Sequence, residues 1–314
     1  MRLDARNPIP DSLRGAIIAL GNFDGFHLGH QAVVGEAVRW ARAEGRPAIV
    51  ATFDPHPVRY FKPEAAPFRL TSLDQREELF AGAGADAMLV FTFDAEFAAI
   101  TAEGFVEGLL RDHLGAAGVV TGVDFTFGKG RGGNLQLLSE LGATCGLKAR
   151  AVGPVEEGGE VVSSSRIRQA LQSGDCATAE RLMTRPFAIR GTVQHGDKLG
   201  RTINFPTANL DIGSYLRPRY GIYAVTAKIP DERLPGGVEV QGAANVGIRP
   251  TFDPPKELLE PYFFDWSGDL YGAEIEVAFH HFLRPEAKFD SLDDLTRQMA
   301  KDCEEAKRLL SGRA

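Results

Sequence analysis

The sequence has few cysteines and no long apolar run. Its 314 residues include three cysteines, which lie far apart at Cys145, Cys176 and Cys303. This usage predicts a reducing compartment and excludes a disulfide framework or a cysteine-based zinc site. No segment approaches the roughly 20 apolar residues of a membrane span, and Met1–Arg6 leads into prolines instead of an apolar stretch. We therefore expect a cytoplasmic protein with no membrane partner.

The sequence also has fewer basic residues than acidic ones. Lys and Arg total 35 against 42 Asp and Glu, which gives a formal net charge of -7. Because affinity for a phosphate backbone comes mainly from basic residues, this balance disfavours a general nucleic-acid binder, although a local basic site remains open. The length is sufficient for two hydrophobic cores, so we expect two domains.

The first half alternates short apolar runs with helical patterns. A capping pattern at Ser72 and Gln75 begins one predicted helix, and Thr101 begins another that runs to Leu114. Alternation of strands and helices predicts right-handed crossovers and a parallel sheet covered on both faces, with ligands bound beyond the carboxyl ends of the strands. The four apolar runs that we assign to buried strands are 16–20, 48–53, 87–91 and 118–120.

The second half has a different pattern. Arg185 and Pro186 interrupt the last helical stretch, so we place the domain boundary between 184 and 185, giving domains 1–184 and 185–314. Alternating segments at 221–229, 238–246 and 273–279 predict a small antiparallel barrel or sandwich. A helix beginning at Ser291 should dock on it through Leu292, Leu295, Met299, Cys303, Ala306 and Leu310. The fold class is thus an α/β Rossmann-like domain plus a small antiparallel β-barrel with a C-terminal helix.

The strongest chemical pattern is Gly21–His30, placed between the first strand and a helix that begins near Gly29. Glycines allow close approach of the backbone, and a helix N-terminus attracts anions. His27 and His30 are three residues apart and share one side of the first turn. A metal pair or a general base is the alternative, but no third ligand is nearby, so we assign the histidines to charge stabilisation at a phosphate site. The nucleotide-binding residues predicted within this run are Gly21, Phe23, Asp24, Gly25 and Gly29.

Two further segments carry candidate phosphate contacts. Ser163–Arg168 places hydroxyl groups at a predicted helix start and follows them with arginines, which suits a triphosphate. An ordinary capped helix with a basic face is the alternative. Gly128–Gly133 superficially resembles a dinucleotide fingerprint or a P-loop, but no Ser or Thr follows its Gly-Lys pair and the run follows the fourth strand, so we reject both.

The run Gly21–His30 resembles the H-x-G-H signature of the nucleotidylyltransferase superfamily. Its full form is similar to the adenylyltransferase domain of the prokaryotic bifunctional riboflavin kinase and FAD synthetase family. Matches in the same order are Phe53–Pro57, Leu70–Ser72 and Gly122–Gly128. This resemblance implies that Asp124 helps to bind adenosine, where an acidic loop cap would be the plain alternative. It also implies catalytic roles in adenylyl transfer for His27, His30, Ser164, Ser165 and Arg168.

A second constellation lies in the C-terminal half. Thr207 and Asn209 are two residues apart on an extended segment, so their oxygens can reach one hard cation. The segment resembles the P-T-A-N motif of the flavokinase family, which implies that both residues hold the magnesium of ATP. The family usually has glycine where this chain has Asn204. The preceding loop supplies the predicted nucleotide-binding residues Gly196, Lys198, Gly200 and Arg201.

Glu260 aligns with the catalytic carboxylate of the same family. The resemblance implies that it accepts a proton from the ribityl hydroxyl as that oxygen attacks the γ-phosphorus. Without the resemblance, a surface acid at a strand end would be favoured, and Pro261 indicates an edge position. Ala244–Thr251 resembles the flavin-side segment of the family, and we assign it only as a binding loop.

The resemblance as a whole implies phosphorylation of riboflavin to FMN and adenylylation of FMN to FAD. ATP, riboflavin, FMN and FAD would be substrates or products, Mg²⁺ the cofactor, and these small molecules the partners, without nucleic acid or membrane. A homo-oligomer is compatible with the sequence. Three alternatives stay open: an adenylyltransferase for another phosphate substrate with a regulatory barrel, a barrel that stores flavin, and a tRNA-binding domain.

Overall fold

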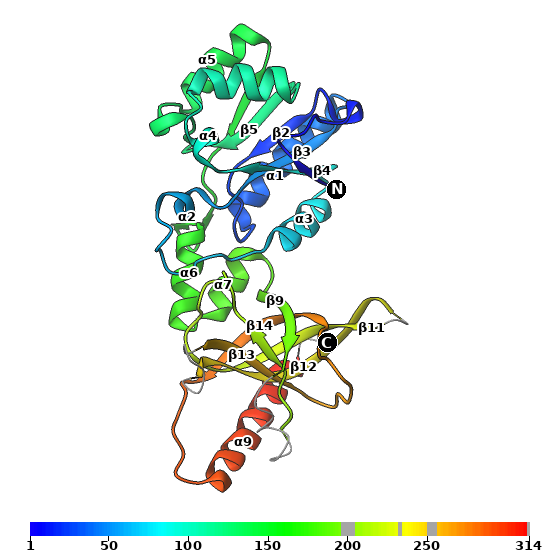
Figure 1. Cartoon of the computed structure of the whole chain (residues 1–314), viewed down its shortest axis with the longest axis vertical. Helices are drawn as coiled ribbons and strands as arrows, with labels where there is room; N and C mark the ends of the chain where they lie inside the picture. Colours follow the sequence, from blue (N-terminus) through cyan, green and yellow to red (C-terminus); the bar gives the residue numbers. More distant parts are fainter. Residues whose placement is uncertain (196–204, 232–233, 250–255, 313–314) are drawn as a thin grey trace. The chain divides into compact units, whose positions relative to one another are not determined.

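The structure is a computed structural model that describes residues 1–195, 205–231, 234–249 and 256–312 (Figure 1). The predicted residues Gly196, Lys198, Gly200, Arg201 and Asn204 lie outside the described residues. The chain divides into two compact units. The N-terminal unit comprises residues 1–66 and 73–163, and the C-terminal unit comprises residues 67–72 and 164–314.

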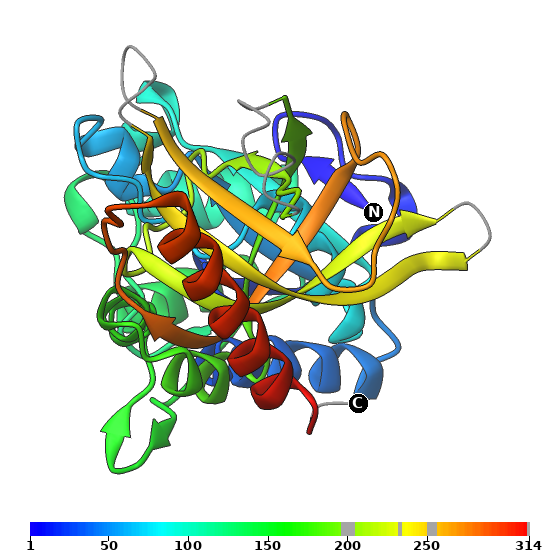
Figure 2. The ribbon, with the colours of Figure 1, turned by 90° about the horizontal axis from the view of Figure 1, so that it is seen from below.

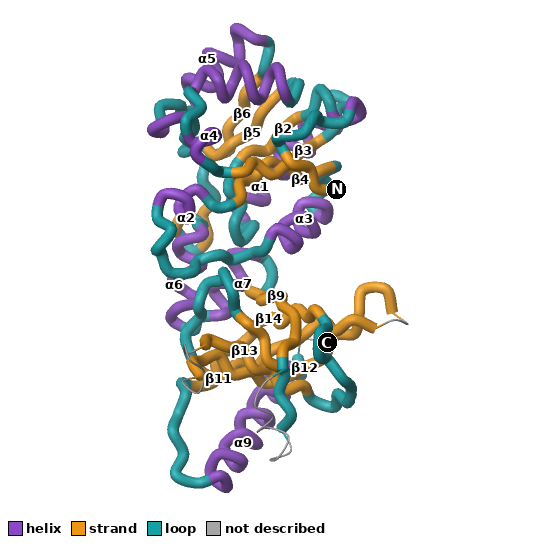
Figure 3. Tube along the Cα trace, viewed as in Figure 1, coloured by secondary structure: helices purple, strands orange, loops and turns teal. Residues whose placement is uncertain are grey.

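The N-terminal unit is built on a six-stranded sheet in which every pair of neighbouring strands is parallel (Figure 3). Its order is β1-β4-β3-β2-β5-β6. The four predicted strands are confirmed as the central members, and two strands at the edges were not predicted. The strand bounds are β1 Arg2–Asp4, β2 Ile17–Leu20, β3 Ala48–Asp54, β4 Ala87–Thr92, β5 Gly118–Gly122 and β6 Lys148–Val152.

Helices cover both faces of this sheet, as Figure 1 shows. One apolar cluster joins α1 and α3 to the sheet through side chains that include Trp40 and Phe80. The other joins η2 and α5 to the opposite face through Phe105, Leu110 and Leu138. The helix bounds are η1 Asp11–Leu13, α1 Leu28–Ala43, α2 Pro57–Phe61, α3 Leu73–Gly82, α4 Ala95–Ala98, η2 Gly104–His113, η3 Lys129–Arg131 and α5 Leu135–Cys145.

The helix predicted from Thr101 to Leu114 differs in its pitch. Thr101 Oγ1 accepts a hydrogen bond from Gly104 N at 3.1 Å, as expected of a capping residue. However, η2 is of the π type, and Leu114 N donates to Leu109 O, five residues earlier, at 3.0 Å. Apolar spacing alone does not separate this wider helix from an α-helix, because both bury a similar stripe.

The C-terminal unit contains a closed barrel of antiparallel strands in the order β10-β13-β12-β11-β14-β9. The predicted alternation is confirmed on β14, where Ile275, Val277 and Phe279 are almost fully buried. The three predicted strands are β11, β12 and β14. The bounds are β9 Phe187–Gln194, β10 Asn209–Asp211, β11 Gly221–Asp231, β12 Leu234–Arg249, β13 Lys256–Phe263 and β14 Glu274–Arg284. A separate hairpin in the N-terminal unit pairs β7 Glu156–Glu157 with β8 Glu160–Val161.

Helix α9 (Leu292–Leu310) lies against the outer face of the barrel, as Figure 2 shows. Ser291 caps it by accepting a hydrogen bond from Asp294 N at 3.1 Å, which confirms the predicted start. Ala306 and Leu310 pack on the sheet, and Cys303 contacts the same cluster. Leu292 was expected on the docked face but is 60% exposed, because the first turn of the helix extends past the apolar cluster.

The C-terminal unit also takes up residues from outside the barrel sequence. Helices α6 (Ser164–Ser173) and α7 (Cys176–Met183) belong to it, as does the segment 67–72. Within this segment, Arg69 N donates to Ser214 O at 3.3 Å and Leu216 N donates to Arg69 O at 2.8 Å. The compact unit therefore begins before the expected boundary at 184/185, which stays a prediction about the extent of the two catalytic domains.

Candidate functional sites

The loop Gly21–His30 joins β2 to α1 and brings two histidine rings together. The His27 and His30 rings stack with centroids 3.6 Å apart and planes 19° apart. His27 caps α1, and its Nδ1 atom accepts a hydrogen bond from His30 N at 3.4 Å. A ring nitrogen that accepts carries no proton, so this bond leaves Nε2 of His27 as the donor. The arrangement therefore offers an N–H donor at the N-terminus of a helix.

The backbone of the loop adopts a conformation that few sequences tolerate. Phe23 and Phe26 have φ values of 49° and 41°, although neither is glycine, and Gly25 has 86°. At Gly29 a Cβ atom would lie 3.2 Å from His27 Cε1, so the absence of a side chain lets the ring fold back over the helix start. Unfavourable backbone angles are retained where the surroundings over-determine them, often at ligand sites.

A buried ion pair holds the loop from below. Arg76 Nη2 donates to Asp24 Oδ1 at 3.1 Å, and the two side chains are 3% and 2% exposed. Arg76 Nη1 also donates to Thr52 Oγ1 at 3.2 Å and to Asn22 O at 3.3 Å, while Thr52 Oγ1 donates to Asn22 O at 2.8 Å. In this structure Asp24 thus anchors the loop, and its direct contact with a nucleotide stays a prediction. Sequence reasoning missed Arg76 and Thr52, and the isolated cation in the acidic segment Asp74–Glu78 was the only signal.

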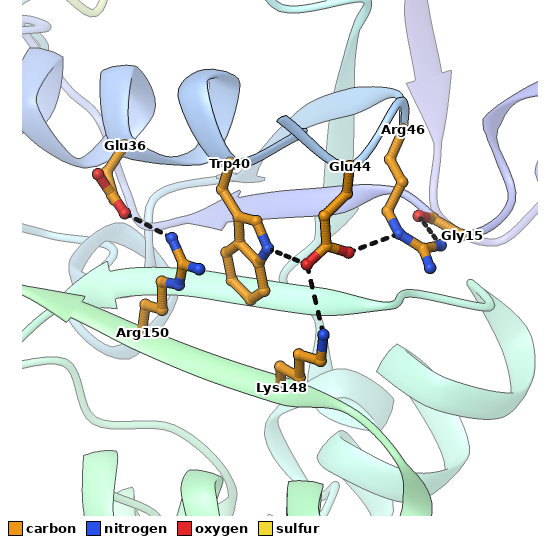
Figure 4. A network of polar contacts seen from close by, with 7 residues as sticks. All are labelled: Gly15, Glu36, Trp40, Glu44, Arg46, Lys148 and Arg150. Carbon is orange, nitrogen blue, oxygen red and sulfur yellow. Dashed lines mark hydrogen bonds and ion pairs between the residues drawn. The ribbon is translucent and has the colours of Figure 1, made fainter. Parts of the chain in front are cut away.

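The far end of α1 is fixed to the sheet by a polar network (Figure 4). Glu44, which ends the helix, accepts hydrogen bonds from Trp40 Nε1 at 2.8 Å and Arg46 Nε at 2.9 Å. Lys148 on β6 lies 3.3 Å from the same carboxylate. The hydrogen bond from Trp40, followed by that from Arg46, lowers the pKa of Glu44 to about 2.

A second bridge joins the same two elements. Arg150 on β6 donates to Glu36 Oε1 at 2.9 Å, and its guanidinium carbon lies 4.0 Å from the centroid of the Trp40 ring (Figure 4). Hydrogen bonds from Arg150 and Arg39 lower the pKa of Glu36. Together with the buried Trp40, these contacts fix the direction in which α1 presents its histidine-bearing N-terminus.

The turn after β5 carries Asp124, which is exposed at the carboxyl end of the sheet. The glycine run that follows closes on itself, because Phe127 and Gly133 exchange backbone hydrogen bonds of 3.0 and 2.9 Å. A Cβ atom at Gly128 would lie 2.8 Å from Ala102 N, and Gly128 has a φ of 73°. These glycines therefore serve backbone packing and a tight turn, in accord with the rejection of a P-loop.

Ser164 and Ser165 are the first residues of α6 in the C-terminal unit. Arg168 lies one turn later, where Nε donates to Phe68 O at 2.8 Å and the guanidinium carbon is 5.1 Å from the Phe68 ring centroid. The predicted helix start is confirmed. The segment 67–72 thus sets the direction of the arginine.

A row of polar side chains crosses the outer face of the barrel. Leu259 and Leu210 are register partners and are fully buried inside it. Because side chains alternate along a strand, Glu260 and Asn209 point to the outer face. One step along this register brings them side by side, and Ala208 N donates to Pro261 O at 2.9 Å in accord with it. Glu260 also pairs in register with Asn245 on β12.

Thr207 lies on the same side of its segment as Asn209, with the buried Ala208 between them. The preceding Phe205 packs edge-to-face on Tyr262, with ring centroids 5.2 Å apart. This contact fixes the segment beside β13. The structure therefore gathers Thr207, Asn209 and Glu260 at one place on the barrel.

The described residues include neither a membrane-spanning helix nor a cluster of charged or thiol ligands for a metal. Among those residues, no helix combines the length and apolar character needed to cross a membrane. Within the same ranges, no group of three or more His, Cys, Asp or Glu side chains could hold a metal ion.

Comparisons with known proteins match each half of the chain to an enzyme family. The FAD synthetase family matches residues 9–166 and the riboflavin kinase family matches residues 183–310. The chain is 40% identical over 289 residues to a bifunctional riboflavin kinase/FMN adenylyltransferase of Escherichia coli K12, covering 92% of this chain and 90% of that protein. It is 37% identical over 302 residues to the Bacillus subtilis 168 protein of the same name, covering 94% and 93%.

A solved structure also covers nearly the whole chain. A protein of Streptococcus pneumoniae, described as a macrolide-efflux protein, superimposes with a TM-score of 0.84 at 30% identity and covers 98% of both chains.

The fold and the two family matches define a nucleotide-dependent transferase, with an α/β nucleotidylyltransferase domain followed by a flavokinase barrel. The sequence identity to the two curated relatives, over nearly the full length of each, narrows this class to one family. The chain belongs to the family of bifunctional riboflavin kinase/FMN adenylyltransferases.

Proposed function

We propose that this chain phosphorylates riboflavin to FMN and adenylylates FMN to FAD. The observation that carries the proposal is the presence of both family matches in one chain, in this order, each over a unit with a candidate site. The histidine-bearing helix start lies in the first unit, and the Asn209–Glu260 row lies in the second. The extent proposed for the two catalytic domains is 1–184 and 185–314.

The adenylyl transfer needs no protein nucleophile. A phosphate oxygen of FMN attacks the α-phosphorus of ATP, a new P–O bond forms, and the bond to the β-phosphate oxygen breaks to release pyrophosphate. Catalysis then consists of positioning and charge stabilisation. We assign charge stabilisation to His27, His30 and Arg168, and hydroxyl donors to Ser164 and Ser165.

For adenylyl transfer, we assign the nucleotide contacts to the loop Gly21–His30 and to the turn after β5. The loop contributes backbone N–H groups near Gly25 and Gly29, and Asp124 is available to the adenosine because it is exposed. The remaining loop residues of this set are Gly21, Phe23 and Asp24.

For the kinase reaction we propose Glu260 as the general base. Its carboxylate would accept the proton of the terminal ribityl hydroxyl while that oxygen attacks the γ-phosphorus and ADP leaves. The outer-face position of Glu260 supports this role, because a base inside the closed barrel could not meet a substrate of this size. Gly196, Lys198, Gly200 and Arg201 lie outside the described residues and keep their predicted role in nucleotide binding.

The residues beside Glu260 fit a magnesium ion. Thr207 and Asn209 supply neutral oxygens on one side of an extended segment, and Mg²⁺ prefers oxygen ligands while retaining several waters. Bound there, the ion would neutralise charge on the phosphates of ATP. The two side chains would hold it, and the contact between Phe205 and Tyr262 would keep them in place.

The experiment that tests the proposal uses purified chain, riboflavin, ATP and magnesium, with the flavins separated by chromatography. Wild type should produce FMN and then FAD. His27→Ala should accumulate FMN, and Glu260→Gln should leave riboflavin unchanged. His113→Ala and Glu304→Gln are controls at residues that neither proposed site includes, and both should behave as wild type. If wild type converts neither flavin, the substrate assignment is wrong.

The same experiment separates the alternatives. An adenylyltransferase for another phosphate substrate with a regulatory barrel would leave both riboflavin and FMN unconverted. A flavin store would bind riboflavin without consuming ATP. We also propose a cytoplasmic location, supported by three free cysteines in the described residues, and assembly into a homo-oligomer stays a prediction.

A further inference from the structure

Asn245 occupies the position beside Glu260 on the outer face of the barrel. The two residues are register partners on β12 and β13, so their side chains leave the sheet on the same side. On its other flank Asn245 pairs with Ile222, which in turn pairs with Arg284. Asn245 therefore stands between the proposed base and an apolar neighbour.

The amide of Asn245 has a defined orientation. Its Nδ2 atom donates to Glu286 Oε1 at 3.2 Å. A carboxylate accepts hydrogen bonds and cannot donate them, so Glu286 selects the rotamer that turns Nδ2 toward it and Oδ1 away. Oδ1 is buried and has no hydrogen-bond partner among the described residues.

Glu286 can take this position because residue 247 is glycine. Gly247 lies two residues after Asn245 on the same face, and a Cβ atom there would overlap the Glu286 carboxylate. Only glycine leaves the space through which Glu286 reaches the amide. The orientation of Asn245 thus depends on Glu286 and on the glycine at position 247.

The chemistry of this place selects its ligand. Asn245 Oδ1 is an acceptor with no donor among the described residues, so it suits a hydroxyl group, which can donate, and not a phosphate oxygen, which cannot. A buried carbonyl oxygen without a donor is unfavourable, so a substrate that supplies the donor gains affinity there.

We propose that Asn245 Oδ1 accepts a hydrogen bond from a ribityl hydroxyl group of riboflavin, and that Glu286 holds the amide in the orientation this requires. Asn245 thereby positions the hydroxyl chain of the acceptor beside Glu260 and selects a polyol-bearing flavin over one without the chain. The inference rests on the proposed kinase function and adds a specificity residue to it.

The test measures riboflavin phosphorylation and flavin binding in the full chain. Asn245→Ala should lower kcat/KM for riboflavin roughly ten-fold, because one substrate hydrogen bond is lost, with the KM for ATP unchanged. Affinity for lumiflavin, which has the same ring system without the ribityl chain, should not change. FMN adenylylation in the same chain should also be unchanged, which shows that the variant is folded. Gln241→Ala removes an amide from the same face of β12 and should match wild type.

A rescue pair separates orientation from packing. Asn245→Asp loses the donor to Glu286 and places two carboxylates together, so it should lose activity. When Glu286→Gln is added, the new amide at 286 can donate to the new carboxylate at 245, which reverses the direction of the original hydrogen bond. The second oxygen of the carboxylate at 245 then remains available to the substrate, so activity toward riboflavin should recover in part.

Three results would overturn the inference. Asn245→Ala within two-fold of wild type would remove the role, and an equal loss of riboflavin and lumiflavin affinity would indicate a structural residue. A raised magnesium requirement with unchanged riboflavin affinity would assign Asn245 to the metal instead. If wild type itself makes no FMN, the proposed function fails and the inference falls with it.

Discussion

Removing the guanidinium of Arg76 should destabilise the N-terminal unit far more than removing an exposed arginine. Arg76 and Asp24 are 3% and 2% exposed, and the guanidinium also binds Thr52 and the carbonyl of Asn22. Arg76→Met keeps an unbranched chain of similar length but leaves the Asp24 carboxylate without this cation. Truncating one member of a buried pair costs about 3 to 5 kcal/mol, because the remaining charge stays in a poorly solvated place.

The chain provides a way to measure this within one unit. It has two tryptophans, Trp40 in the N-terminal unit and Trp266 in the C-terminal unit. In a Trp266→Phe background, urea unfolding followed by fluorescence reports only on the surroundings of Trp40. With a urea slope of about 2 kcal/mol per molar, the expected loss lowers the midpoint by about 1.5 to 2.5 M.

Two further variants interpret the result. Arg39→Met removes an arginine that is 71% exposed and bonded to Glu36, so it should cost less than about 1 kcal/mol. The double variant Asp24→Asn with Arg76→Met should be more stable than the sum of the single changes by at least about 1 kcal/mol, because the pair is coupled.

The consequences for activity should be confined to one reaction. The loop Gly21–His30 loses its anchor, so adenylyl transfer should fall while riboflavin phosphorylation persists. The reasoning fails if Arg76→Met unfolds within about 1 kcal/mol of the Arg39→Met variant, or if both activities fall together.

Two other properties follow from perturbed ionisation. The pKa of Glu44 is lowered to about 2, chiefly by the hydrogen bond from Trp40, so its contribution to stability is full above pH 4.5 and is lost as the pH falls toward 2. The urea midpoint of Glu44→Gln should therefore lie below that of wild type at pH 6 and meet it near pH 2, and a constant gap would contradict this. Burial, followed by the charge of Asp175, raises the pKa of the Cys176 thiol to about 12. Iodoacetamide at pH 8 should thus modify Cys176 much more slowly in the native chain than in urea, as peptide mass spectrometry would measure, and equal rates would refute the burial argument.

The fold was predictable where one pattern dominates. The four central strands read as uninterrupted apolar runs because the sheet is covered on both faces, and Ser291 marks the start of α9 through its capping bond. The edge strands β1 and β6 were not predicted, because residues such as Arg2, Lys148 and Arg150 interrupt any apolar run. A strand that pairs on one side only tolerates such residues, since its free edge meets solvent.

Site residues were likewise predictable only where the interacting residues are close together in the sequence. His27 and His30 were predicted because one turn of helix contains their whole relationship. Arg76 lies 52 positions after Asp24, and Glu286 lies 41 after Asn245, so neither partnership leaves a local pattern. Both are polar groups that hold another polar group in place. Their identity depends on which strands the fold brings together, so register and burial, which only the structure supplies, are needed to find the residues that orient a motif.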